Sequence, residues 1–378
     1  MVAGNAPDCS LAIIGAGVVG CALAAALVER GPVGDGEILL LEAAAREGTG
    51  VSARNSGVVH AGLYYEPGSR KARSCVEGNA RLWSWVAAHG VAHRRTGKLV
   101  VAAGPQEQRR EEEAALEALL ANALRCGAAI EPVSLDRARE LEPALPATVA
   151  AALWSPNSGI VDAHGLVRSL LVAAQDRGVV FVPSSPVSRI DTAARGFVLH
   201  TDRGPILAER IVNAAGLHAT TLAAQLGLSH RLYPARGDYF RLRRAAPWQR
   251  LIYPVKLPGS PSLGIHLTLE LDGRARLGPD LEWLLEDRRE DYSPESGEAK
   301  HGVFLEAARR LLGPLEAEDL VYDGCGIRPK IVGPGEKAGD FEMVESPAGA
   351  WHLLGIESPG LTAGMALGHE LTGRLTVG

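Results

Sequence analysis

Cysteine is sparse in this 378-residue chain, and the few cysteines are not arranged for a metal or for disulfides. There are five of them, an odd number, and no two form a Cys-x-x-Cys pair. Zinc sites and disulfide frameworks need such clustering. The sequence therefore predicts no bound metal and a reducing compartment, which indicates a cytoplasmic protein. The scattered cysteines are Cys9, Cys21, Cys75, Cys126 and Cys325.

An excess of basic residues is also missing. The chain has 39 Lys and Arg against 44 Asp and Glu, which gives a formal net charge of −5. Proteins that bind nucleic acid or an anionic membrane surface usually carry a basic patch or block. We therefore expect no nucleic-acid partner.

Long uninterrupted apolar runs are absent as well. Residues 1–8 lack the positive charge of a secretory signal, and glycines interrupt the apolar stretch that follows. The sequence predicts no integral membrane segment and leaves peripheral association with an inner membrane as an open alternative. A hydrophobic content of 46% and a charged content of 22% are those of a globular protein.

A glycine-rich turn stands between an apolar run that begins at Leu11 and an apolar helical pattern. The turn reads Gly15-Ala16-Gly17-Val18-Val19-Gly20, and a Gly/Pro break, a second apolar run and Glu42 follow. In a strand–helix–strand unit, such glycines permit a tight turn, an approach of backbone amides to a pyrophosphate, and close helix packing. An acidic residue after the second strand can accept ribose hydroxyls. The stretch predicts a dinucleotide site and leaves NAD and FAD as alternatives.

The rest of the chain alternates between α/β stretches and an antiparallel block. The spacing of apolar residues predicts a helix from Ser69 to Gly90 and an amphipathic surface helix over 106–127. Alternating patterns with Gly/Pro punctuation predict antiparallel strands over 230–278, and the C-terminal stretch predicts a helix. A cofactor domain built from separate segments, with a substrate domain inserted in it, accounts for this order.

Characteristic segments occur along the whole chain. The loop and helix after the first unit read VSARNSGVVHAGLYYEPGSRKARSCVEGNARL from residue 51. Later segments are Gly97-Lys98-Leu99, 155–162, Asn213-Ala214-Ala215-Gly216, Tyr253-Pro254-Val255, 263–266, 277–279, Gly326-Ile327-Arg328-Pro329-Lys330 and Glu357-Ser358-Pro359-Gly360-Leu361-Thr362. Together with the glycine turn, they resemble the FAD-dependent 2-hydroxyglutarate dehydrogenase/oxidase family, within the glycine-oxidase and D-amino-acid-oxidase superfamily. The resemblance implies FAD as the cofactor.

The resemblance also implies the fold class and the domains. We expect an α/β fold with a discontinuous Rossmann-like FAD-binding domain and an inserted α+β substrate domain that contains a mostly antiparallel sheet. The FAD-binding domain would comprise residues 1–90, 149–228 and 319–378, and the substrate domain residues 91–148 and 229–318.

The FAD site that the resemblance implies is assembled from distant stretches. Small polar residues allow backbone amides to approach the cofactor, and a helix that begins at Gly360 directs its N–H groups at the flavin. The predicted cofactor-binding residues are Gly15, Ala16, Gly17, Val18, Val19, Gly20, Glu42, Ala43, Ser52, Arg54, Asn55, Ser56, Gly57, Val58, His60, Val187, Ala214, Ala215, Gly216, Arg328, Gly360, Leu361 and Thr362.

Arg328 is the main substrate-side candidate. The resemblance implies that the arginine of Gly326-Ile327-Arg328-Pro329 binds the α-carboxylate of the substrate. A guanidinium group pairs with a carboxylate through two parallel hydrogen bonds, which fixes the orientation of the bound acid.

Two histidines are candidates for the catalytic base. Oxidation of a 2-hydroxy acid transfers hydride from C2 to flavin N5, and the hydroxyl proton goes to a base. Imidazole titrates near neutral pH and suits this role. His60 is the leading candidate because it lies in the predicted flavin-facing loop, and His266 is the alternative.

Further hydroxyl and cationic side chains are candidates for substrate contacts. We expect Tyr64, Tyr65, Tyr253 and Arg236 to line the site, with Arg236, Lys98 and Lys256 as alternatives for binding a second carboxylate. Cys325 precedes the Arg328 motif and raises the question of a covalent flavin link, although a packed, unreactive thiol is the interpretation that we favour.

The predicted activity is FAD-dependent oxidation of a small L-2-hydroxy acid, such as 2-hydroxyglutarate, to the 2-oxo acid. Electrons would pass to oxygen or to a quinone-type acceptor. One alternative is an amino-acid or amine oxidase of the same superfamily, which takes hydride from a C–N centre. Another is a flavoprotein whose FAD is structural and whose function is to bind a partner.

Overall fold

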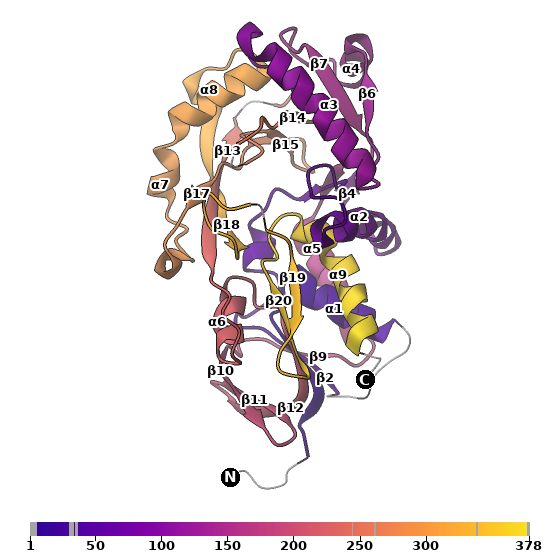
Figure 1. The fold of residues 1–378 in the computed structure, drawn as a ribbon, viewed down its shortest axis with the longest axis vertical. Coiled ribbons are helices and arrows are strands. Elements are labelled where there is room, and N and C mark those ends of the chain that lie inside the picture. The colour runs from indigo at the N-terminus through magenta and orange to yellow at the C-terminus, as the bar shows by residue number, and fades with distance from the viewer. Residues whose placement is uncertain are drawn as a thin grey trace.

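The computed structural model describes residues 6–29, 34, 37–243, 245–260, 262–337 and 339–375. The predicted Gly/Pro break at Gly31 and Pro32 and the two chain ends lie outside these residues. The molecule is elongated, with two sheets at opposite ends of its long axis (Figure 1).

The predicted strand–helix–strand unit is present at the N-terminal end of the chain. It consists of β1 (Cys9–Ile14), α1 (Val18–Val28) and β2 (Ile38–Leu41), and the two strands pair in parallel. Gly20 lies where α1 meets the turn, and a Cβ at this position would overlap the carbonyl oxygen of Gly15. The third glycine of the motif therefore permits the close packing for which it was predicted.

The first sheet is built on this unit from segments far apart in the sequence. Its strand order is β10-β11-β12-β1-β2-β9, and β20 also pairs with β12 and with β19. The centre of the sheet is parallel, and the β10–β11–β12 edge is antiparallel. The added strands are β9 (Val180–Val182), β10 (Val187–Ala193), β11 (Gly196–Thr201), β12 (Gly204–Asn213), β19 (Glu342–Glu345) and β20 (Ala350–Leu354).

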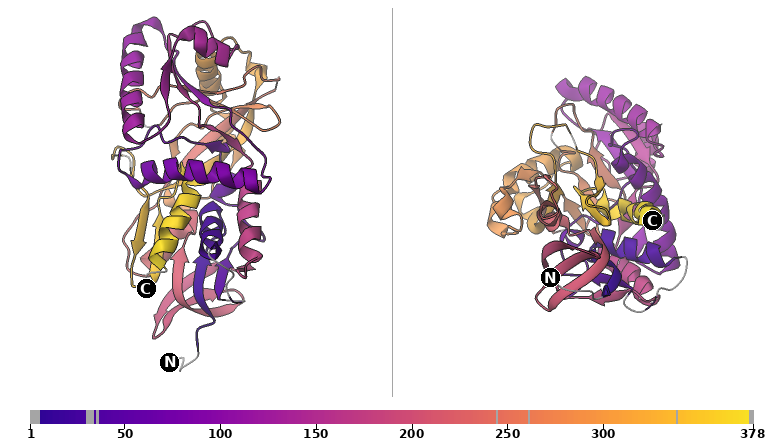
Figure 2. Two further views of the ribbon diagram at one scale, coloured as in Figure 1. Left: turned by 90° about the vertical axis from the view of Figure 1, so that its right-hand side faces the viewer. Right: turned by 60° about the horizontal axis from the view of Figure 1, so that its bottom comes forward.

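Helices cover the first sheet and enclose its apolar core. α1 packs against α5 and α9, and α2 lies across α9, as Figure 2 also shows. Their apolar faces meet side chains of β1 and β2 in one buried cluster. The helices of this part are α2 (Arg70–Ala88), α5 (Ala163–Gln175), α6 (Ala219–Ala224) and α9 (Gly360–Leu375).

The second sheet is antiparallel except for the pair β14–β5. Its strand order is β17-β13-β16-β15-β14-β5-β7-β6, with β18 paired to β13. Its strands are β5 (Lys98–Ala102), β6 (Glu131–Val133), β7 (Ala151–Ser155), β13 (Tyr233–Leu242), β14 (Leu251–Pro254), β15 (Leu267–Leu269), β16 (Ala275–Leu277), β17 (Glu282–Trp283) and β18 (Leu320–Lys330). Its helices are α3 (Arg109–Arg125), α4 (Leu135–Leu141), α7 (Pro294–Glu298) and α8 (His301–Leu312).

This architecture confirms the predicted fold class, but two predicted domain boundaries differ from the membership of the sheets. β7 falls in the range 149–228 and β18 in the range 319–378, which were assigned to the FAD-binding domain. Both strands belong to the second sheet, because β7 pairs with β5 and β18 pairs with β13. The small sheet of β3 (Val58–Val59), β4 (His93–Arg94) and β8 (Gly159–Val161) lies apart from the two large ones.

Candidate active site

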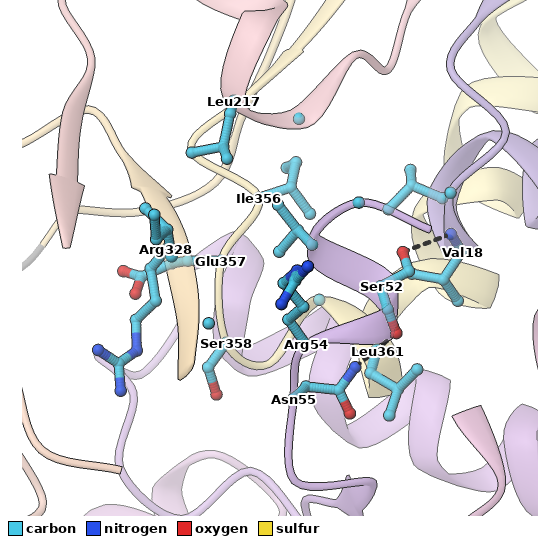
Figure 3. A pocket seen from close by; sticks show the side chains of 18 of the residues that line it. Val18, Ser52, Arg54, Asn55, Leu217, Arg328, Ile356, Glu357, Ser358 and Leu361 are labelled. Carbon is cyan, nitrogen blue, oxygen red and sulfur yellow. Dashed lines mark hydrogen bonds between the residues drawn. The ribbon is translucent and has the colours of Figure 1, made fainter. Parts of the chain in front are cut away.

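A cavity of about 1000 Å³ is lined by segments of both sheets. The glycine turn, the loop after β2, the end of β18 and the beginning of α9 all contribute to its lining. Figure 3 shows Arg328 and Ser358 on one side of this space and Ser52 and Asn55 on the other.

At the glycine turn, main-chain atoms form one wall of the cavity, because the glycines have no side chains to cover them. Gly15 has φ +104°, and a Cβ there would lie 2.6 Å from the carbonyl oxygen of Ala214. At Gly17 a Cβ would meet the hydroxyl of Ser52 at 3.0 Å. That hydroxyl accepts a hydrogen bond of 2.9 Å from the amide of Val18, in the first turn of α1. The wall therefore offers backbone amides and the positive end of a helix to an anionic group.

Glu42 follows β2 and completes this wall. Its two carboxylate oxygens accept hydrogen bonds from the amides of Ala16 (2.8 Å) and Ala44 (2.9 Å), which fix the side chain beside the glycine turn. The adjacent loop is held by Asn55, which donates to the Ser52 carbonyl at 2.7 Å and accepts from the Gly57 amide at 2.7 Å.

Most of the predicted cofactor residues line the cavity. Four of them are not part of the lining: Ala16, Gly20, Gly57 and Thr362. Gly20 permits close helix packing, and the hydroxyl of Thr362 accepts a hydrogen bond from the amide of His60. Those that line it are Gly15, Gly17, Val18, Val19, Glu42, Ala43, Ser52, Arg54, Asn55, Ser56, Val58, His60, Val187, Ala214, Ala215, Gly216, Arg328, Gly360 and Leu361. A glycine cradle, a fixed carboxylate and the first turns of two helices fit a dinucleotide.

His60 lies at the cavity on a well-anchored backbone. Its amide donates to the Thr362 hydroxyl at 3.0 Å, and its carbonyl accepts from the side-chain amide of Asn79 at 2.9 Å. The imidazole Nε2 is 3.5 Å from the Ser358 hydroxyl, whereas Nδ1 has no hydrogen-bond partner among the described residues. Burial, with the nearby charge of Lys98, lowers the pKa of His60 to about 3, so the ring is neutral at neutral pH.

His266 also faces the cavity, and its tautomer follows from its contacts. Its Nδ1 is 2.8 Å from the carbonyl oxygen of Gly264, so Nδ1 carries the hydrogen and Nε2 keeps its lone pair. The ring stacks on Tyr253 with 3.8 Å between the centroids. Burial lowers the pKa of His266 to about 3. The structure therefore brings both predicted bases to one cavity in their neutral forms.

Arg328 lies near the end of β18 with its guanidinium group at the cavity. It donates to the carbonyl oxygens of Asp280 (3.1 Å) and Arg236 (3.5 Å), and a Cβ at Gly237 would come within 2.8 Å of its Nη2. Within the described residues, no carboxylate is in ion-pair distance of this guanidinium. Its positive charge is thus available to an anionic ligand.

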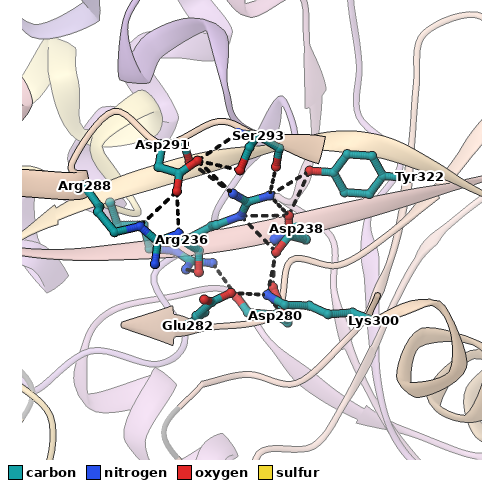
Figure 4. A network of polar contacts seen from close by, with 10 residues as sticks. Arg236, Asp238, Asp280, Glu282, Arg288, Asp291, Ser293, Lys300 and Tyr322 are labelled. Carbon is teal, nitrogen blue, oxygen red and sulfur yellow. Dashed lines mark hydrogen bonds and ion pairs between the residues drawn. The ribbon is translucent and has the colours of Figure 1, made fainter. Parts of the chain in front are cut away.

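Arg236, predicted to contact substrate, is fully buried and lies away from the cavity lining. Its guanidinium donates to the Asp238 carboxylate (2.9 Å), the Ser293 carbonyl (2.6 Å) and the Tyr322 hydroxyl (3.1 Å). Figure 4 shows these groups around it. The substrate-binding prediction for Arg236 is therefore wrong, because the donors of this arginine are already occupied.

Tyr253 needs the same correction, since it is fully buried and does not line the cavity. It packs behind His266 instead. Tyr64 and Tyr65 do line the cavity, and so does the exposed Lys256. Lys98 is fully buried and is not part of the lining.

Cys325 is buried in β18 and is not part of the cavity lining. Burial raises the pKa of its thiol, which favours the unreactive form. The geometry thus agrees with a packed thiol rather than with a covalent link. Within the described residues, moreover, no cluster of three or more His, Cys, Asp or Glu side chains is placed to hold a metal ion.

One group of charged residues at the cavity was not singled out from the sequence. The carboxylate of Glu357 pairs with Lys330 at 2.6 Å and with Lys71 at 2.8 Å. Lys330 ends the Arg328 segment and Glu357 begins the last characteristic segment, so both stood in quoted motifs. Nothing in the spacing indicated that the two segments meet.

Across the part of the chain that is described, no helix is both long and apolar enough to cross a membrane.

Comparisons with known proteins agree with this geometry. The L-2-hydroxyglutarate dehydrogenase of Arabidopsis thaliana mitochondria is 33% identical over 96% of this chain and 82% of its own length. The corresponding protein of Caenorhabditis elegans is 31% identical over 97% of this chain and 93% of its own. The FAD-bound L-alpha-glycerophosphate oxidase of Mycoplasma pneumoniae shares the fold, with a TM-score of 0.85, 22% identity, and coverage of 98% of this chain and 94% of that one. The pattern of the FAD dependent oxidoreductase (DAO) family matches residues 10–374. The chain therefore belongs to the FAD dependent oxidoreductase family, which confirms FAD, rather than NAD, as its cofactor.

Proposed function

We propose that this protein oxidises L-2-hydroxyglutarate to the 2-oxo acid. The observation that carries the proposal is the guanidinium of Arg328, which faces the cavity without a carboxylate partner among the described residues and shares that cavity with two neutral histidines. The relatives named L-2-hydroxyglutarate dehydrogenase support the choice of substrate.

Arg328 would bind the C1 carboxylate. Its contacts to the Asp280 and Arg236 carbonyls orient the guanidinium without neutralising it. A charge-assisted pair to a carboxylate then fixes the acid with C2 in a defined position. The neutral carbonyl partners explain how a cation can be held in place and still remain free to bind.

Lys330 is our candidate for the second carboxylate. It follows Arg328 by two residues in β18, and side chains two apart leave the same face of a strand. Both residues line the cavity. Because Glu357 is shared by Lys330 and Lys71, this group carries a net positive charge. A five-carbon diacid would thus meet a cation at each end, with the exposed Lys256 as a further cation at the cavity.

FAD, when bound, supplies a two-electron acceptor that takes the C2 hydrogen as hydride. The residues Gly15, Gly17, Glu42 and Gly360 would hold it, as their positions at the cavity indicate. The chain has to take up the proton that the C2 hydroxyl releases. Nε2 of His60 is the proposed acceptor, and Nε2 of His266, which keeps a lone pair, is the alternative.

The electron acceptor and the location belong to the same proposal. We propose that electrons leave to oxygen or to a quinone, in a cytoplasmic protein that associates peripherally with the inner membrane if a quinone is the acceptor. Reoxidation of the reduced protein by dissolved oxygen, compared with reoxidation by a soluble quinone, identifies the acceptor.

Anaerobic mixing of the yellow holoenzyme with single candidate substrates tests the proposed reaction. We expect L-2-hydroxyglutarate to bleach the flavin absorbance much faster than D-2-hydroxyglutarate, L-lactate, L-glutamate or glycine. Faster bleaching by an amino acid would favour the C–N oxidase alternative. A flavin that none of these acids bleaches would favour a structural role for FAD.

A further inference from the structure

Lys98, the first residue of β5, has a fully buried side chain. Its amine lies 5.0 Å from the ring centroid of Tyr64 and 4.5 Å from that of Tyr253. It has no hydrogen-bond partner among the described residues. An unpaired ammonium in such a place is costly, since desolvation favours the neutral amine.

The five other lysines of the chain all differ from Lys98 in their surroundings. Lys71 and Lys330 pair with Glu357, and Lys337 pairs with Glu66. Lys300 lies among the carboxylates of Asp238, Asp280 and Glu282 (Figure 4). The side chain of Lys256 is exposed to solvent. Lys98 is thus the one lysine that combines full burial with an unpartnered amine in the described part of the chain.

The groups around Lys98 are polar, and several are equally unpartnered. Nδ1 of His60 and the hydroxyls of Tyr64 and Tyr253 are buried without a hydrogen-bond partner in the described residues. The charge of Lys98 reaches His60 and His266, because it lowers the pKa of both rings. Cys75 of α2 faces it as well and opposes the effect of burial on its pKa. Unpartnered polar atoms in one buried region can be linked by bound water into a path for a proton.

We propose that Lys98 receives the substrate's proton from His60. This inference rests on the proposed function. The hydroxyl proton of the substrate passes to Nε2 of His60, and Nδ1 releases a proton towards the amine of Lys98, which becomes an ammonium group. The path runs past the hydroxyls of Tyr64 and Tyr253. Lys98 acts through His60 and does not touch the substrate, so it is a positioning residue for the proton.

The chemistry explains why His60 needs a second group. An imidazole with a pKa of about 3 does not keep a proton at neutral pH. Burial lowers the pKa of Lys98 to about 7, so a large part of this amine is neutral at the same pH and is the stronger base of the two. The proton therefore moves from the weaker base to the stronger one.

The first test measures the charge of Lys98 in the holoenzyme without any turnover. With six lysines, protein labelled with ¹³C at lysine Cε gives few resonances, and the one that Lys98→Met removes belongs to Lys98. We expect this resonance to titrate with a midpoint near 7. A midpoint above about 9 would overturn the proposal, whatever the substrate is.

The second test measures the rate constant of anaerobic flavin reduction at saturating substrate as a function of pH. For the wild type, we expect a rise with pH through an ionisation near 7. Lys98→Met should reduce at least ten times more slowly above that pH and should lack the ionisation. Lys98→Arg should be equally slow, because a guanidinium stays protonated. Arg137→Met, on the exposed surface of α4, is the control and should match the wild type.

The arginine variant separates proton transfer from a structural role. If Lys98 only holds Tyr64 and Tyr253 through its charge, Lys98→Arg keeps the wild-type rate and pH profile, and the proposal is wrong. If neither variant binds FAD, the pH dependence of flavin reduction in the wild type is the test. A wild-type reduction rate that shows no ionisation near pH 7 contradicts the relay. A holoenzyme that no hydroxy acid reduces contradicts the proposed function instead. The NMR titration needs no substrate, so it still shows whether the amine of Lys98 has a midpoint near 7.

Discussion

Arg328 shows how uncharged neighbours can hold a cation in place and leave it free to bind an anion. Backbone carbonyls orient its guanidinium, and Gly237 leaves room for it. Arg328→Met should remove a charge-assisted pair worth about 1.5–3 kcal/mol and lower kcat/KM by about 10- to 150-fold, chiefly through KM. Steady-state kinetics measures KM and kcat/KM, and the FAD content of the purified variant shows whether cofactor binding is retained. An unchanged KM for every hydroxy acid would contradict the carboxylate assignment.

Lys330 should decide between diacids and monoacids. Lys330→Met removes the proposed partner of the distal carboxylate, so we expect a higher KM for L-2-hydroxyglutarate and little change for L-lactate, which lacks that group. Among the described residues, Glu357 then keeps Lys71 as its ion-pair partner. Steady-state kinetics with the two acids measures the ratio of the effects. An equal rise for both acids would show that Lys330 supports the site as a whole.

The buried amine of Lys98 also makes stability depend on pH in a definite direction. Its pKa is about 7 when folded, against an ordinary value of 10.5, so between these values the unfolded chain binds a proton that the folded chain does not. Stability contributed by this group therefore rises with pH across that window and is lowest below pH 7. The gain in Tm from Lys98→Met over the wild type should be larger near pH 6 than near pH 10. Calorimetry of the holoenzymes at both pH values measures it, and an equal gain would rule out a low pKa.

Among the elements, the contact of α2 with the first turn of α9 connects helix packing to the candidate site. A Cβ at Gly78 in α2 would overlap the carbonyl oxygen of Thr362, and the hydroxyl of the same Thr362 holds the amide of His60. Gly78→Ala gains about 0.5–1 kcal/mol of helix propensity but costs about 1–3 kcal/mol through overpacking. We expect a lower Tm and weaker FAD binding, measured by calorimetry and fluorescence titration.

A second glycine serves as the control for this prediction. Gly373 lies in the last turn of α9, and a Cβ there would meet nothing within 4 Å. Gly373→Ala should leave FAD binding unchanged and raise stability slightly, since only the propensity remains. Equal effects of the two substitutions would show that the Gly78 contact is unimportant.

The sequence could predict those elements whose signals are local. The glycine motif follows β1 and runs into the first turn of α1 as expected, and Ser69 caps α2 by accepting from the Ala72 amide at 3.1 Å. The predicted helix over 106–127 begins as a short 3-10 turn and becomes α3 only at Arg109. Such signals depend on neighbours in the sequence, which a single chain displays directly.

The pairing of segments far apart in the sequence could not be predicted from local patterns. β18 joined the second sheet because its partner is β13, some 90 positions earlier in the chain. The burial of Arg236 has the same cause, since its partner Ser293 comes from a distant loop. Lys98 was a candidate for binding a second carboxylate, and only the folded packing shows that its amine is buried beside Tyr64 and Tyr253. The side chains whose observed setting differs from the predicted one are those whose contacts come from distant parts of the sequence.

On the scale of the whole molecule, the cavity is where the two sheets depend on each other. Residues from β1, from the turn after β12 and from α9 meet residues from β18 around one space, so a bound FAD would contact segments that are far apart in the chain. The glycine cradle positions the cofactor, while Arg328 on the second sheet positions the acid. Neither sheet carries a complete site by itself.

Removal of FAD should therefore affect the stability of the entire fold. A ligand that binds only the folded state stabilises it by about 2.7 kcal/mol at a free concentration of 100 Kd. We expect the Tm of the apoprotein to rise steadily with added FAD, and one calorimetric transition of the holoenzyme to include both sheets. NAD added at the same concentrations is the control and should leave the Tm unchanged. If FAD left the Tm unchanged, or sharpened only one of two separate transitions, the cavity would not couple the sheets, because linkage requires the ligand to contact both.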